Sequence, residues 1–233
     1  MERVRQHIRD FSHLVFPFNC YSCSQALDET EAHICSNCRE RFPVTKYWEQ
    51  KENTVEKLFW GKVPIKQAAS FMFFIKDGMA QRLMHHLKYN GKTKVGEVLG
   101  QTFGQKLKGT SFAEAELIVP IPLHITRQKT RGYNQCDSIA AGMSQSLKTP
   151  YDANAVERIR ANESQTKKGR YERHINVQEL FKVVHPERIE GKHVLLIDDV
   201  VTTGSTLEAC ADTLLQVPNT TVSVATIACP SPY

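Results

Sequence analysis

Two adjacent carboxylates and the hydroxyl-rich run that follows them are the side chains best suited to chemistry. Asp198 and Asp199 come directly after the apolar residues 194–197. The run that follows gathers hydroxyls around one glycine: Thr202, Thr203, Gly204, Ser205 and Thr206. A loop that enters a helix offers unpaired backbone N–H groups, so this run is suited to one phosphate. Carboxylates suit hydroxyl groups or a divalent cation. A ribose 5-phosphate carries both kinds of group.

The elements around this run explain how it would be positioned. Residues 194–197 predict a buried parallel strand that stops at the two acids, because they form a short, branched apolar run. Apolar residues from 207 to 215 recur at helical spacing. The run therefore indicates a polar loop beyond the carboxyl end of a strand, where open α/β sheets bind ligands. The alternative is an ordinary strand followed by a helix with Ser205 as N-cap.

Residues 196–206 resemble the signature of type I phosphoribosyltransferases, which bind phosphoribosyl pyrophosphate (PRPP). The resemblance implies that the acids hold the ribose hydroxyls and that the loop holds the 5′-phosphate. It also implies the fold, which is a mainly parallel central sheet flanked by helices, with a hood over the base site. The implied PRPP-binding residues are Asp198, Asp199, Val200, Val201, Thr202, Thr203, Gly204, Ser205 and Thr206.

Three cations follow a second apolar run at residues 117–120, which predicts another buried strand. Arg127, Lys129 and Arg131 would then lie on the same rim as the acids and stabilise the charge of a pyrophosphate leaving group. The alternative is that they form a solvated turn. Lys88 and Lys92 lie in the segment that would form the hood, so they are either solvated or contact the acceptor.

Four cysteines near the N-terminus have the spacing of a zinc site. Cys20 and Cys23 form one Cys-x2-Cys pair, and Cys35 and Cys38 form the other. Two such pairs complete a tetrahedral site, and four thiolates leave no open position, so we expect a structural zinc ion in a small zinc-ribbon-like module. The alternatives are two disulfides or a reduced remnant without metal. Cys136, Cys210 and Cys229 are expected to be buried thiols.

The cysteine pairs and several basic motifs together resemble the ComF family of phosphoribosyltransferase-like proteins, which are associated with DNA uptake. The matching motifs are residues 120–123, Arg127, residues 131–135, Arg158, Arg160, Gln165, Thr166, Arg173, Asn176, Val177 and Phe181. Residues 167–170 depart from the expected hydrophobic spacer. The resemblance implies a possible role in handling single-stranded DNA.

Composition supports a globular chain with one larger domain. The formal charge of +5 is a mild bias towards anionic partners, and no apolar run approaches the roughly 18 residues that span a membrane. We expect an N-terminal helix with a zinc module over 1–50, a phosphoribosyltransferase-like domain over 51–233, and a cytoplasmic location. Strands are expected over 68–74, 180–184 and 221–228, and helices over 79–87, 95–107 and 139–147. Residues 4–15 predict a docking helix, residues 42–61 an aromatic linker, and residues 161–174 a loop that closes over the site.

Three functions follow from this reading. The first is an enzyme in which PRPP binds with magnesium and a nitrogen nucleophile displaces pyrophosphate from ribose C1. The second is a competence factor that binds single-stranded DNA by charge and by stacking on Tyr89 and Tyr133, with the PRPP pocket as a sensor. The third is a regulator that binds PRPP without turnover. The sequence names no general base, no acceptor and no oligomeric state.

Overall fold

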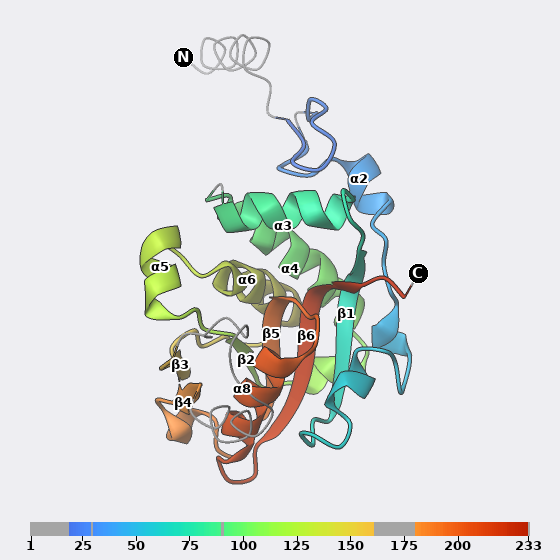
Figure 1. The fold of residues 1–233 in the computed structure, drawn as a ribbon. Helices are drawn as coiled ribbons and strands as arrows, with labels where there is room; N and C mark the ends of the chain where they lie inside the picture. The colour runs from blue at the N-terminus through green and yellow to red at the C-terminus, as the bar shows by residue number, and fades with distance from the viewer. Residues whose placement is uncertain (1–18, 29, 90, 161–179, 233) are drawn as a thin grey trace, which may run out of the picture.

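The computed structural model describes residues 19–28, 30–89, 91–160 and 180–232 (Figure 1). The expected helix over 4–15 and the expected closing loop over 161–174 lie outside these residues, as do Gln165, Thr166, Arg173, Asn176 and Val177. No helix within the described ranges is long and apolar enough to cross a membrane.

Four parallel strands form the central sheet in the order β1-β6-β5-β2. They are β1 (Gln67–Phe74), β2 (Leu117–Pro120), β5 (His193–Val200) and β6 (Thr221–Pro230). Residues 194–197 of β5 are fully buried, because helices cover both faces of the sheet. The strands expected over 68–74, 117–120 and 221–228 are confirmed.

Helices cover the two faces of the sheet unequally (Figure 1). The face behind the sheet in that view carries α4 (Thr93–Leu107) and α6 (Gln135–Leu147), and the front face carries α8 (Ser205–Leu215). Helix α3 (Met79–Tyr89) lies across the upper end of the sheet. The expected apolar faces of α3, α4 and α6 are confirmed. Residues 125–131, which carry the three cations, form the short helix α5 (Ile125–Arg131). Gly132, with φ of 82°, ends that helix in the left-handed conformation.

Glycines bring α4 and α6 into close contact. A Cβ atom on Gly100 would lie 2.1 Å from the carbonyl oxygen of Ile139, and a Cβ atom on Gly142 would lie 2.1 Å from that of Glu97. The side chains of Gln101 and Gln145 are joined by a hydrogen bond of 2.6 Å at the same crossing. This contact fixes the position of α6, whose first turn lies at the acids.

A second, smaller sheet lies beside the first. Its strands β3 (Val156–Arg158) and β4 (Phe181–Val183) are antiparallel, and β4 packs against α8. The strand expected over 180–184 is therefore confirmed, but it pairs outside the central sheet. The sequence did not indicate β3.

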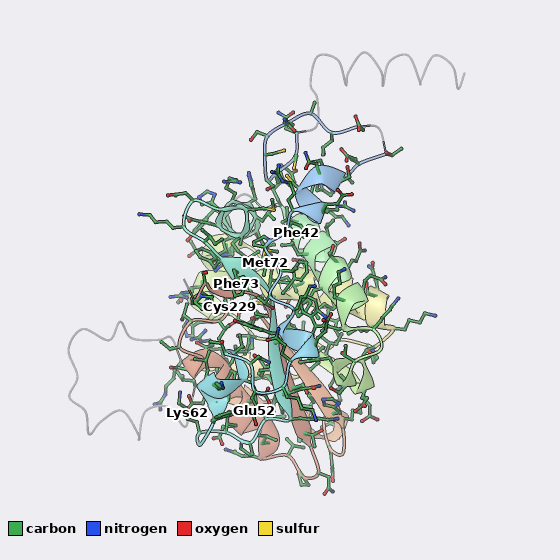
Figure 2. All side chains as sticks on the ribbon, turned by 90° about the vertical axis from the view of Figure 1, so that its right-hand side faces the viewer. Phe42, Glu52, Lys62, Met72, Phe73 and Cys229 are labelled. Atoms are coloured by element: carbon green, nitrogen blue, oxygen red, sulfur yellow. The ribbon has the colours of Figure 1, made fainter. Side chains whose placement is uncertain are left out.

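The first described residues, from residue 19 onward, lie on α3 and then along the open edge of β1 (Figure 1). The cysteine segment includes α2 (Ser36–Glu40), and Arg82 of α3 donates a hydrogen bond of 2.6 Å to the carbonyl oxygen of Ser22. The next segment then follows β1: Val44 bridges Met72, and Phe73 N–H donates to Pro43 at 2.8 Å. Figure 2 shows Phe42, Met72 and Phe73 gathered at this edge.

The remaining short elements are 3-10 turns: η1 (Tyr47–Glu49), η2 (Glu56–Phe59), η3 (Ser111–Glu114) and η4 (Pro186–Arg188). Trp48 of η1 packs edge-on against Phe103 of α4, with ring centroids 5.6 Å apart. The aromatic segment over 42–61 therefore packs into the main core, as expected for a linker that contacts the body of the protein. The division into 1–50 and 51–233 stays a prediction.

Candidate functional site

The two acids belong to β5 itself, which continues to Val200. The expected stop of the strand before Asp198 is wrong, because the backbone of Asp198 still pairs with Thr226 of β6 and that of Val200 with Ala228. Since successive side chains of a strand point to opposite faces, Asp198 and Asp199 leave the strand in different directions. Asp198 is half-buried and Asp199 is buried.

The hydroxyl-rich loop connects β5 to α8. Gly204, with φ of 80°, is the N-cap residue of α8, and no side chain caps the helix. The alternative in which Ser205 caps the helix is therefore wrong, because Ser205 is the first helical residue. Thr202, Thr203 and Ser205 are exposed, and the hydroxyls of Thr203 and Ser205 lie 3.0 Å apart.

A small open hollow of about 40 Å³ lies over this loop, lined by Asp198 and residues 200–207. The first N–H groups of α8 have no acceptor within the helix and point towards its N-terminal end. The hollow therefore combines backbone donors, side-chain hydroxyls and the positive end of a helix dipole, which together suit an anion. Val200 and Val201 contribute backbone here, and Val201 N–H is bonded to Ala228 at 2.9 Å.

Asp198 is partly protonated at neutral pH. Its burial, followed by the charge of Asp199, raises its pKa to about 7, against the opposing effects of Asp199 N–H, the Cys136 thiol and Lys88. Oδ1 of Asp198 accepts hydrogen bonds from Asp199 N–H at 2.8 Å and from the Cys136 thiol at 3.4 Å. Cys136 is buried, as expected, and it lies in the first turn of α6.

Asp199 is held by an ion pair that the sequence did not indicate. Lys88 Nζ at the end of α3 lies 2.6 Å from Asp199 Oδ2, and Gln135 Nε2 donates to the same oxygen at 3.3 Å. Arg131 donates to Gln135 Oε1, and the Tyr133 hydroxyl donates to the carbonyl oxygen of Leu87. The C-terminal end of α3 therefore contacts the acids through Lys88, and no periodicity in the sequence predicts that ion pair.

The three expected rim cations are placed differently from one another. Arg127 and Lys129 are exposed on α5, whereas Arg131 is half-buried and reaches the acids through Gln135. Lys92 lies over the ring of Tyr21 at 5.6 Å, on the side of the cysteine segment. Tyr133, expected to be exposed, is half-buried.

The four N-terminal cysteines converge on one centre. Their Sγ atoms all lie within 4.8 Å of one another, and those of Cys23 and Cys35 are 3.8 Å apart. A tetrahedron with Zn–S bonds of about 2.3 Å has sulfur–sulfur distances of about 3.8 Å. The N–H groups of Ser22 and Cys35 each lie 3.4 Å from Cys20 Sγ. Burial opposes ionisation of Cys20, but such backbone hydrogen bonds outweigh it and lower its pKa to about 7. All four thiols are free in the structure, so the residues present fit a zinc ion.

Comparison with known proteins agrees with this geometry. A sequence model of the phosphoribosyl transferase domain matches residues 134–230, which include α6, β5, the hydroxyl-rich loop and β6. The competence protein ComFC of Bacillus subtilis is 27% identical over 84% of this chain and 78% of its own length. The competence protein F of Haemophilus influenzae is 38% identical over 40% of this chain and 41% of its own length. The chain is thus similar to competence proteins of the ComF type and carries a match to the phosphoribosyl transferase domain.

Other relatives match a shorter part of the chain. The DNA utilization protein YhgH of Salmonella typhi is 30% identical over 61% of this chain, and the match covers 63% of that protein's length. The family's fold expectation, a parallel sheet with flanking helices and a four-cysteine cluster near the N-terminus, is confirmed.

Proposed function

We propose that the chain binds PRPP between the hydroxyl-rich loop and the two acids. The observation that carries this proposal is the hollow lined by Asp198 and residues 200–207, in which anion-binding groups and a carboxylate stand together. The 5′-phosphate accepts hydrogen bonds from the N-terminus of α8 and from the hydroxyls of Thr202, Thr203, Ser205 and Thr206. Asp198 and Asp199 accept hydrogen bonds from the ribose hydroxyls.

In the proposed reaction a nitrogen nucleophile attacks ribose C1. The bond from C1 to the pyrophosphate oxygen breaks, and its electron pair leaves with the pyrophosphate. Arg127, Lys129 and Arg131 stabilise that growing negative charge. The carboxylates of Asp198 and Asp199 favour the cation-like ribose of the transition state, because they lie beside the sugar.

Two metals belong to the proposal. Magnesium prefers oxygen ligands and would neutralise the negative charge of the pyrophosphate; Asp198, which lines the hollow, and its neighbour Asp199 are the carboxylates that would hold it. Zinc would be held by Cys20, Cys23, Cys35 and Cys38 in a structural role. A cytoplasmic location is also part of the proposal, since the seven cysteines are free in the structure.

Calorimetry of PRPP with magnesium tests the binding proposal. We expect wild-type protein to bind and the double variant D198N/D199N to lose at least a hundredfold in affinity. Asp212→Asn, at an exposed position of α8, is the matched control and should bind like wild type. Binding that survives the double substitution would show that the acids do not hold the ligand.

A panel of nitrogen bases then separates an enzyme from a sensor. Pyrophosphate release on addition of one base would establish transfer. Binding of PRPP without release, for every base and for ammonia, would instead support a regulator.

Handling of single-stranded DNA is a second candidate, suggested by the names of the relatives and by one surface feature. Tyr89 is 69% exposed, with the Arg131 guanidinium 5.9 Å and the His85 ring centroid 5.0 Å from its own ring centroid. An exposed ring beside a guanidinium suits base stacking and phosphate contact. Oligonucleotide binding should fall steeply with salt, weaken in Tyr89→Ala and survive D198N/D199N. If no oligonucleotide binds even at low salt, this candidate is excluded.

A further inference from the structure

Arg158 is a buried cation whose guanidinium is not fully hydrogen-bonded within the described part of the protein. Its side chain belongs to β3, the residue is 8% exposed, and its Nε atom has no hydrogen-bond partner among the residues that the structure describes. The guanidinium carbon lies 5.4 Å from the ring centroid of Phe181, its partner across β3 and β4. Burial of a charged group with an unpaired donor is costly, so a purely structural role does not explain this arginine.

The surroundings of Arg158 connect it to the candidate site. Burial, followed by the charge of Arg127, lowers the pKa of Arg158, whereas the charge of Asp198 raises it. Arg158 is therefore within electrostatic range of Arg127 on α5 and of Asp198 near the end of β5. A guanidinium stays protonated under all such shifts at neutral pH.

Two arginines near one another repel unless an anion lies between them. Arg158 and Arg127 together present the positive charge that a phosphate group neutralises, and a guanidinium fork matches phosphate oxygens. The hydroxyl-rich loop already supplies donors for one phosphate. The pair therefore suits a second phosphate of the same ligand, on the α5 side of Asp198.

We propose that Arg158 is a binding residue for the pyrophosphate group of the ligand, acting together with Arg127. This inference rests on the proposed function and extends it, because it predicts that the site prefers ribose phosphates that carry pyrophosphate at C1. The burial of Arg158 restricts the partner to a small ligand, since a nucleic-acid backbone cannot reach a side chain that is 8% exposed.

Calorimetry with three probes in magnesium buffer tests the assignment: PRPP, ribose 5-phosphate and inorganic pyrophosphate. In Arg158→Met we expect PRPP and pyrophosphate to bind at least tenfold more weakly, because a charge-assisted hydrogen bond is lost. Ribose 5-phosphate should bind within threefold of wild type. Arg188→Met is the control, since Arg188 is paired with Asp152 outside the site.

A thermal melt of the free protein gives a second, independent readout. Removing a buried, incompletely paired cation should leave the melting temperature of Arg158→Met unchanged or raised. A fall of several degrees would show a structural role and overturn the proposal. If Arg158→Met does not fold, Arg158→Lys takes its place, and an unchanged ratio of PRPP to ribose 5-phosphate affinity in that variant overturns the proposal.

The outcomes separate this inference from the proposed function. Equal affinity of wild type and Arg158→Met for PRPP, or an equal loss for PRPP and ribose 5-phosphate, would refute the role of Arg158 alone. If wild-type protein binds none of the three probes, the proposed function itself fails.

Discussion

Replacing Asp198 with asparagine should stabilise the free protein at pH 8 while weakening its ligand binding. Asp198 has its pKa raised from 3.8 to about 7 by burial and by Asp199. Asparagine keeps an oxygen that accepts from Asp199 N–H and the Cys136 thiol, but it carries no charge. The substitution therefore removes the cost of ionising a buried acid and preserves its two hydrogen bonds.

The size of the effect follows from the two pKa values. Between about pH 4 and pH 7 the native protein holds a proton on Asp198 that the unfolded chain has lost. The free energy of unfolding of the wild type therefore falls as the pH rises through this range. A shift of about 3 units at about 1.36 kcal/mol each gives a loss on the order of 4 kcal/mol by pH 8.

Urea unfolding without magnesium, followed by tryptophan fluorescence, measures this difference. Asp198→Asn and wild type should have nearly equal unfolding free energies at acid pH, and the variant should gain on the wild type up to about pH 7. The contributions of other titrating groups to the unfolding free energy are the same in both proteins and cancel in the difference, apart from that of Asp199, which interacts with Asp198. Asp212→Asn should change stability by less than about 0.5 kcal/mol throughout. A difference between Asp198→Asn and wild type that is no larger at pH 8 than at pH 4 would refute the reasoning.

Three further predictions concern contacts that support the site. Gly100→Ala should destabilise the protein by about 1–3 kcal/mol in urea, because its Cβ atom would lie 2.1 Å from a backbone oxygen, whereas Gln105→Ala on the exposed side of α4 should have little effect. Lys88→Met should lower the free energy of unfolding by about 2 kcal/mol, because it leaves Asp199 buried without its cation. The control is Lys94→Met, which should lower it by less than about 1 kcal/mol, because the Lys94 side chain is 61% exposed and paired with Glu97. Equal losses in the two variants would contradict the buried pair. Cys20→Ser should lower the zinc content of purified protein from one equivalent towards zero, while Cys210→Ser should keep it, and unchanged metal in Cys20→Ser would refute the ligand set.

The sequence predicted the central sheet and its main helices because their apolar residues repeat at regular spacing. Residues 117–120 and 79–87 are buried on the faces that their patterns indicate. Asn134 caps α6, and its Oδ1 accepts from Cys136 N–H at 3.2 Å. Local patterns of this kind depend on neighbours in the sequence, so one chain is enough to read them.

Contacts between distant residues were not predictable in the same way. The pair of Lys88 and Asp199 joins residues on different elements, and nothing in either local pattern marks the other. β3 has only three residues, which is too short to show alternation. Arg158 was noticed as part of a family motif, but its burial and its unpaired Nε atom emerge only from the fold.

The segment along β1 has a practical consequence for shortened versions of the protein. β1 is an outer strand of the sheet, and residues 43–45 cover it by bonding to Phe71 and Phe73. A fragment that begins at residue 51 would lose that cover and present free backbone groups to other molecules, which invites self-association. A fragment that begins at residue 42 would omit the four-cysteine segment yet keep the strand protected, and it is the better starting point for studying the proposed ligand pocket in isolation.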